Sequence, residues 1–163
     1  VNMADLNKLL TPLFLNEKEI RKVIELLFFS YRDFTSGPDK ILEKLDFGRA
    51  HHRVIYFVGK QKKITIKELL SILQITKQSL SRVLNQLVKE QYIIVSTGLD
   101  KRTKNLSLTK KGKSLENELS TIQITKIRKI IKNYNESDIN GFKKILYSMI
   151  DKKNKLKFDE INN

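Results

Sequence analysis

The sequence predicts a mainly α-helical protein with one small β-hairpin. Two observations lead to this fold class. Apolar residues recur at helical spacing along most of the 163 residues, and residues 92–108 show the alternation and turn-rich composition of a hairpin. The length suits one domain or one compact dimerising unit.

Two short helices are predicted just before the hairpin. Thr65 is a favourable N-cap for the first, and Glu68, three residues later, completes a capping box. The dipeptide Gln74-Ile75 forms a turn, and Thr76 caps the second helix. This order predicts a helix-turn-helix followed by a β-wing.

The second helix has one apolar and one polar face. The apolar face comprises Leu80, Val83, Leu84, Leu87 and Val88. The polar face carries Gln78, Arg82, Asn85 and Lys89, with Ser79 and Ser81 beside it. Polar residues at the N-terminal end of such a helix can contact base edges in the major groove of DNA. A solvated face is the alternative interpretation, and for this helix alone it is the commoner one.

The hairpin strengthens the nucleic-acid interpretation. The stretch Tyr92–Val95 is β-branched and aromatic, and in residues 105–108 leucines alternate with polar residues, so both predict strands. The loop between them, residues 97–103, has a basic tip. Arg102 on such a loop can enter a narrow minor groove, with Asp100 holding its guanidinium through a charge-assisted hydrogen bond. The alternative is an exposed hairpin with incidental charges.

The same residues resemble a known family. Asp100-Lys101-Arg102, followed by Leu108-Thr109 and Gly112, matches the D-x-R…L-T-x-x-G wing signature of MarR-type transcriptional regulators. The preceding ITKQSLSRVLNQLVKEQYI resembles their recognition helix, and the run GRAHHR at residues 48–53 resembles the PetP-like subgroup. The resemblance covers nearly the whole chain. It implies a homodimeric winged helix-turn-helix regulator, most often a repressor, whose N- and C-terminal helices form the dimer interface.

Three segments follow from these patterns. We expect N-terminal dimerisation helices in residues 1–47, a winged helix-turn-helix in residues 48–112 and C-terminal dimerisation helices in residues 113–163. The apolar stripes of residues 16–34 and 135–150 are wider than a lone helix can bury, which favours a helical dimer. An intramolecular helical hairpin at the C-terminus is the alternative.

Caps and breakers predict the remaining helix boundaries. Further caps are expected at Asn16, Gly48, Thr109 and Asn135. Residues 1–15 suit either a short helix or a frayed tail. Gly37-Pro38 is expected to end or kink the N-terminal helix, and Gly59 to end the helix that begins at Arg49.

Composition narrows the function further. Residues 60–113 hold 13 basic and 3 acidic side chains, so this segment contributes +10 of the formal net charge of +14. Such a field favours polyanions, nucleic acid first and acidic membrane second. There is no cysteine, which excludes disulfides and thiolate metal sites. The sequence has no signal peptide or membrane-spanning run, so a cytoplasmic protein is expected.

No pattern of an enzyme is present. There is no glycine-rich phosphate loop and no Ser-His-Asp, Cys-His or paired-carboxylate arrangement, so neither catalysis nor a cofactor is expected. His51 and His52 are adjacent and point to different sides of a helix, so no metal site is predicted. The resemblance implies a pocket for a small aromatic effector. Its candidate residues are Tyr31, Phe34, His51, Arg53 and Phe57, for which packing is the alternative role.

The sequence therefore predicts a dimeric regulator that binds a pseudo-palindromic operator in double-stranded DNA. Base contacts are expected from Gln78, Ser79, Arg82 and Asn85, and phosphate contacts from Thr76, Lys77 and Ser81. On the wing, Arg102 is expected in the minor groove, oriented by Asp100, with Lys101 and Lys104 on the backbone. The rival hypotheses are a non-specific architectural nucleic-acid-binding protein and a protein-interaction module.

Overall fold

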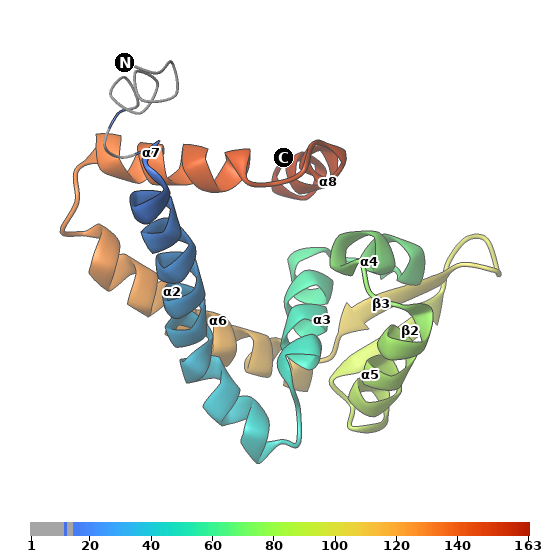
Figure 1. Cartoon of the computed structure of the whole chain (residues 1–163). Helices are drawn as coiled ribbons and strands as arrows, with labels where there is room; N and C mark the ends of the chain where they lie inside the picture. The colour runs from blue at the N-terminus through green and yellow to red at the C-terminus, as the bar shows by residue number, and fades with distance from the viewer. Residues whose placement is uncertain (1–11, 13–14) are drawn as a thin grey trace. The chain divides into compact units, whose positions relative to one another are not determined.

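The computed structural model describes Pro12 and residues 15–163 of the chain (Figure 1). Apart from Pro12 and Leu15, the prediction for residues 1–15 lies outside the described residues. The chain forms two compact units, residues 1–37 and 38–163, which are described separately below. The expected division into dimerisation and winged-helix segments stays a prediction.

The N-terminal helix is longer than the sequence predicts. Helix α2 runs without interruption over Glu17–Lys44, and the Asn16 side chain accepts a hydrogen bond from the Glu19 N–H at 3.0 Å, which confirms the cap. Gly37-Pro38 was predicted to end or kink the helix, and the prediction of an end was wrong. A proline inside a helix removes one backbone donor, and its ring crowds the carbonyl four residues earlier. Pro38 is almost fully buried, and we attribute the continuous helix to this packing.

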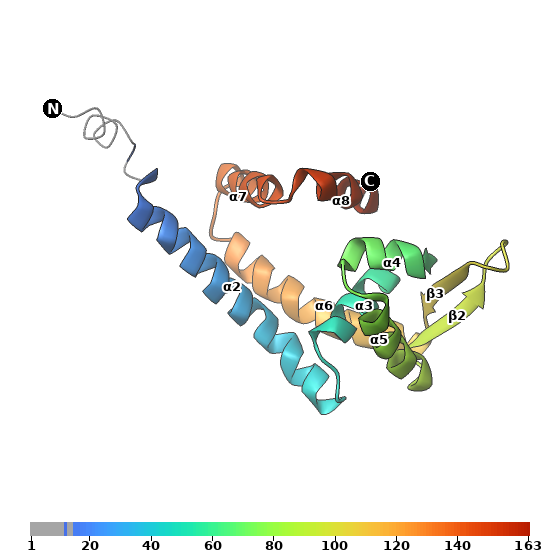
Figure 2. The ribbon, with the colours of Figure 1, turned by 45° about the vertical axis from the view of Figure 1, so that its right-hand side comes forward.

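The second unit begins with the last turns of α2 and holds the remaining elements (Figure 2). In chain order they are α3 (Arg49–Lys60), β1 (Ile64–Thr65), α4 (Ile66–Leu73), α5 (Lys77–Lys89), β2 (Ile93–Thr97), β3 (Lys104–Leu108), α6 (Lys110–Ile131), α7 (Glu136–Ser148) and α8 (Lys152–Asn162). This order confirms a mainly helical fold with a winged helix-turn-helix.

The wing contains one more strand than the sequence predicts. The sheet has the order β1-β3-β2 and is antiparallel throughout. Ile64 pairs with Leu106, and Ile93 pairs with Leu108 across the hairpin. Strand β1 has only two residues and is followed directly by α4. It is therefore too short to show the alternation of apolar and polar residues that predicts a strand.

The core lies where α3, α4 and α5 meet the sheet and the start of α6. Its most buried side chains include Ile55, Leu69, Leu80, Leu106 and Leu119, each exposing 1% or less of its surface. Burying a side chain of this size stabilises the fold by about 1.5–3 kcal/mol. One core therefore positions both the helix-turn-helix and the hairpin.

Side-chain caps fix the helix starts in this unit. Thr65 accepts a hydrogen bond from the Glu68 N–H at 3.1 Å, and its own N–H donates to the Glu68 carboxylate at 2.8 Å, which confirms the capping box. Hydrogen bonds that the Thr65 N–H and the Thr65 hydroxyl donate to the Glu68 carboxylate hold the pKa of Glu68 below its ordinary value. The predicted caps at Thr76, Thr109 and Asn135 are confirmed in the same way.

The prediction for Gly59 was wrong. Helix α3 continues to Lys60 and ends at Gln61, so Gly59 lies inside the helix. A Cβ atom at this position would lie 2.8 Å from Leu108 Cδ1 and 3.1 Å from Glu116 Cγ. The glycine therefore permits a close approach of α3 to β3 and α6, a packing role that spacing along one helix does not reveal.

Helix α8 was not predicted from the sequence, which suggested α7 as the last helix. It contacts the winged helix through two polar pairs within the second unit. Gln74 Nε2 donates to Asn154 Oδ1 at 2.6 Å, and Lys60 Nζ donates to Asn162 Oδ1 at 2.7 Å. Its hydrophobic side chains Leu156 and Phe158 are exposed. The helix therefore has no buried apolar face that a periodic sequence pattern would predict.

Both ends of the chain carry apolar side chains at the surface. In α2 they include Ile20, Val23, Ile24, Leu26, Phe28 and Phe29. In α6 and α7 they include Ile124, Ile127, Ile130, Phe142, Ile145 and Met149. No residue of α7 is buried. Across the described residues, no helix combines the length and the apolar character that crossing a membrane requires.

Gly112 allows the first turn of α6 to lie against the chain that enters the hairpin. A Cβ atom at Gly112 would overlap the backbone carbonyl oxygen of Tyr92. We expect Gly112→Ala to lower the free energy of unfolding by about 1–3 kcal/mol, since neither backbone segment can move aside without strain. Urea denaturation followed by circular dichroism measures the change.

Gly141 provides the matched control, because no atom lies within 4 Å of a Cβ built there and it also sits inside a helix. Gly141→Ala should raise stability by about 0.5–1 kcal/mol through helix propensity. Equal responses of the two variants would contradict a steric role for Gly112.

Candidate nucleic-acid interface

Helix α5 has the two faces that the sequence predicts. Leu80, Val83, Leu84 and Leu87 are buried in the core. The residues of the polar face, Gln78, Ser81, Arg82 and Asn85, are all exposed. Val88, also predicted on the apolar face, lies in the last turn and exposes 37% of its surface. The helix therefore presents a continuous polar strip to solvent.

The N-terminus of α5 is organised by two hydroxyl groups. Thr76 Oγ1 accepts a hydrogen bond from the Ser79 N–H at 3.1 Å, and the Thr76 hydroxyl donates to Ser79 Oγ at 2.9 Å. The first N–H groups of a helix lack partners within it, and the helix dipole makes this end positive. Such an end can accept a phosphate group or another anion.

The predicted interface residues lie on two neighbouring elements of the second unit, helix α5 and the hairpin. Both ribbon views show α5 beside the hairpin, with the β2–β3 loop projecting beyond the sheet (Figures 1 and 2). All eleven residues are exposed: Thr76, Lys77, Gln78, Ser79, Ser81, Arg82, Asn85, Asp100, Lys101, Arg102 and Lys104. They come from two segments, the first turns of α5 and the hairpin.

A chain of hydrogen bonds shapes the loop at the hairpin tip. The Gly98 N–H donates to the Thr103 carbonyl, and the Thr103 N–H to the Asp100 carbonyl, each at 2.8 Å. The Asp100 carboxylate accepts a hydrogen bond from the backbone N–H of Arg102 at 3.0 Å. Asp100 thus fixes the backbone of the turn, whereas the sequence suggested a bond to the Arg102 guanidinium.

The interface keeps its positive charge. Among the ion pairs found in the described residues, none involves Arg82, Lys101 or Arg102. Lys104 Nζ donates to Thr97 Oγ1 at 3.4 Å, an interaction without a counter-charge. The surface therefore attracts anions over the distance set by ionic screening, about 8–10 Å at physiological salt.

The five effector-pocket candidates belong to different units. Tyr31 and Phe34 lie in the first unit, and His51, Arg53 and Phe57 lie on α3 in the second. Phe57 packs against the core and Arg53 is exposed. The effector pocket stays a prediction.

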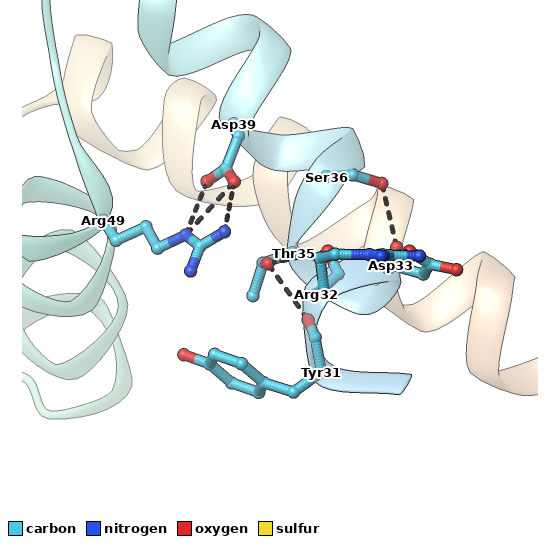
Figure 3. Close-up of polar contacts among 7 residues, drawn as sticks. All are labelled: Tyr31, Arg32, Asp33, Thr35, Ser36, Asp39 and Arg49. Carbon is cyan, nitrogen blue, oxygen red and sulfur yellow. Dashed lines mark hydrogen bonds and ion pairs between the residues drawn. The ribbon is translucent and has the colours of Figure 1, made fainter. Parts of the chain in front are cut away.

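Polar side chains near the end of α2 form hydrogen bonds and one ion pair. In the first unit, the buried Thr35 hydroxyl donates to the Tyr31 carbonyl at 3.0 Å. In the second unit, the Arg49 guanidinium faces the Asp39 carboxylate, with an Nη2–Oδ2 distance of 2.9 Å (Figure 3). The pair ties the end of α2 to the start of α3.

The two adjacent histidines have separate surroundings. Burial lowers the pKa of His52, and the nearby Asp39 and Glu116 carboxylates partly oppose that shift. His51 faces α5 and stacks on Phe47, with ring centroids 4.7 Å apart. Within the described ranges, no three His, Cys, Asp or Glu side chains gather in a way that could hold a metal ion.

Comparison with known proteins decides the family. A family profile described as the MarR family matches residues 45–103. The HTH-type transcriptional regulator PetP of Rhodobacter capsulatus is 43% identical over 142 residues, which cover 86% of each chain. The chain belongs to the MarR family. It is thus a transcriptional regulator by family and not an enzyme.

Solved structures of MarR-type proteins share the fold. The complex of FabT from Streptococcus pneumoniae with DNA is similar with a TM-score of 0.72 and 22% identity, covering 80% of this chain and 94% of FabT. A mutant MarR from E. coli complexed with operator DNA has a TM-score of 0.63 and 20% identity, covering 86% and 99%.

Sequence reasoning missed one residue at this MarR-type interface. Gln86 lies on α5 at the edge of the polar strip, yet its side chain turns inward to His51 and to the Asp46 carbonyl. The signal was weak, since glutamine at the edge of a strip is usually solvated. The position of His51 three residues after the Gly48 N-cap could have suggested the bond from the Gly48 N–H to the His51 ring.

The role of Asp100 in this MarR-type wing yields a test. Asp100→Ala removes the acceptor of the Arg102 N–H, so we expect hydrogen exchange at the Arg102 amide to accelerate about fivefold, since a net hydrogen bond is worth about 1 kcal/mol. Asp100→Asn keeps an acceptor oxygen and should retain the wild-type rate. NMR-detected exchange provides the rates, and equal rates in all three proteins would refute the assignment.

Proposed function

We propose that this MarR-family protein is a dimeric, sequence-specific DNA-binding regulator, acting as a repressor at a pseudo-palindromic operator in the cytoplasm. Helix α5 enters the major groove, and the β2–β3 loop reaches the flanking minor groove. Gln78, Ser79, Arg82 and Asn85 contact bases, and Thr76, Lys77 and Ser81 contact phosphates.

The observation that carries this proposal is the exposure of polar and basic side chains on both α5 and the adjacent hairpin. Its side chains combine the two kinds of contact that sequence-specific proteins make. Gln78, Arg82 and Asn85 have the donors and acceptors for bidentate contacts to base edges. Lys101, Arg102 and Lys104 carry charges that ion pairs among the described residues do not neutralise, and such charges favour phosphates and narrow minor grooves.

Relatives of the same fold support DNA as the partner. FabT was solved in complex with DNA and a MarR mutant in complex with operator DNA. By extension, we infer that double-stranded DNA is the partner of this chain. The resemblance to the family also suggests repression and a small aromatic effector near Tyr31, Phe34, His51, Arg53 and Phe57.

The exposed apolar side chains support a homodimer. Phe28 exposes 64% of its surface, Ile145 62% and Ile24 61%, more than a chain that remains alone in water usually leaves in contiguous stripes. Pairing these faces between two copies would remove them from water. It would also place two α5 helices at a fixed distance, as half-sites about 34 Å apart require.

A non-specific architectural protein is the second candidate. The concentration of +10 of the net charge in residues 60–113 favours it, because phosphate attraction alone can give tight binding without sequence preference. The two candidates differ in whether affinity depends on the base sequence, so one pair of arginines separates them.

Arg82→Ala and Arg102→Ala should both weaken binding to a selected operator duplex by about 1–3 kcal/mol in free energy, without unfolding the protein. Arg82→Ala should also reduce the discrimination between operator and random duplex, because Arg82 is proposed to contact bases. Fluorescence anisotropy at near-physiological salt measures both affinities.

Lys89→Ala is the matched control, since Lys89 is also exposed and lies on the same face two turns along α5, about 10 Å away. It removes one charge and should leave discrimination unchanged. Unchanged operator affinity in Arg102→Ala would reject the wing assignment, and an equal loss on both duplexes in Arg82→Ala would move that residue to a phosphate role.

A further inference from the structure

The junction between α2 and α3 contacts the middle of helix α5. After Lys44 the chain turns at Asp46, which has a positive φ of 55°, and Phe47 is buried. Gly48 then caps α3, and His51 is the third residue of that helix. All of these residues belong to the second unit.

His51 bridges this junction to α5 with both ring nitrogens. The Gly48 N–H donates to His51 Nδ1 at 3.0 Å, and His51 Nε2 lies 2.8 Å from Gln86 Oε1. Because an N–H can only donate, Nδ1 must be the acceptor, and the ring proton therefore lies on Nε2 and is donated to Gln86. One neutral tautomer satisfies both bonds.

Gln86 uses its other amide atom to complete the link. Gln86 Nε2 donates to the Asp46 carbonyl oxygen at 3.3 Å and to Glu90 Oε1 at 3.2 Å. The side chain is thus bonded to Glu90 at the C-cap of its own helix, to Asp46 in the α2–α3 junction and to His51 on α3. A glutamine held by three directional contacts has little freedom to rotate.

Aromatic stacking supports the same bridge. The His51 ring lies parallel to the Phe47 ring, with an interplanar angle of 8°. Phe47 meets the Tyr92 ring edge-on at 5.3 Å, and the Lys111 ammonium lies 4.1 Å above Tyr92. The stack therefore runs from the α2–α3 junction to the base of the wing and the start of α6.

We propose that His51 and Gln86 are a positioning pair that sets the rotation of the recognition helix α5 about its own axis. Gln86 lies next to Asn85 and one turn after Arg82, so a rotation at Gln86 moves both of these proposed base contacts. The apolar contacts of α5 resist separation but are non-directional, whereas the His51–Gln86 bond is directional. This inference rests on the proposed function.

Three variants isolate the bond from the packing around it. His51→Phe keeps a ring against Phe47 and removes both hydrogen bonds, and Gln86→Met keeps the length of the side chain without its polar atoms. His51→Gln is the matched control, because a glutamine at the third helical position can accept from the N-cap N–H and still donate towards Gln86.

The readout is the ratio of two affinities, for a duplex selected from a randomised library and for its scrambled sequence, at one salt concentration. We expect this ratio to fall about tenfold in His51→Phe and in Gln86→Met, on the scale of one weakened base contact. His51→Gln should keep it within about twofold. The double variant should lose no more than either single variant, since both remove one link.

Thermal unfolding of each variant separates positioning from stability. Suppose the wild type prefers the selected duplex and the variants lose stability but keep the same affinity ratio. That result would overturn the positioning role, because a pair that only stabilises the fold changes stability and not the affinity ratio. A wild type that binds both duplexes alike would overturn the proposed function, and this inference with it. If His51→Phe does not fold, Gln86→Met makes the same comparison from the other partner.

Discussion

The contact between the start of α6 and the chain entering the hairpin determines how the winged helix is built. The Thr109 N–H donates to the Tyr92 carbonyl at 3.0 Å, and the Thr109 hydroxyl donates to the Gln91 carbonyl at 2.6 Å. Gly112 leaves room for the helix to lie against the same carbonyl. Because β2 follows Tyr92 and β3 precedes Thr109, these contacts close the hairpin at its base.

Closing the base leaves the β2–β3 loop to project beyond the sheet (Figures 1 and 2). Strand β2 begins only a few residues after the end of α5. Leu106 of the hairpin and Leu80 of α5 are buried in the same core, which fixes the direction of the hairpin relative to the recognition helix. Polar and basic side chains on both segments are exposed. The proposed recognition of DNA in two adjacent grooves depends on this geometry, and the family membership makes DNA the reasonable partner to test.

Much of this arrangement could be predicted from the sequence because its signals are local. Each helix start is marked by a cap whose partner lies three residues along the chain, as at Thr65 (with Glu68), Thr76 and Thr109. The alternation of leucines with polar residues around Leu106 marks a half-buried strand. The same locality gave the faces of α5, since burial of Leu80, Val83, Leu84 and Leu87 follows helical periodicity.

The errors concern contacts between residues distant in sequence. Gly59 meets Leu108 and Glu116 from other elements, and Pro38 stays helical because tertiary burial outweighs the loss of one donor. Strand β1 exists only through its pairing with β3. The bond between His51 and Gln86 was missed because it spans 35 residues and has no periodic signature.

Selection from a randomised duplex library at near-physiological salt, followed by sequencing of the bound fraction, tests the central claim most directly. The account predicts enrichment of a motif with two-fold symmetry and half-sites about one helical turn apart. Binding without enrichment, with an affinity that falls steeply as salt rises, would contradict it, because phosphate contacts alone would then explain the interaction.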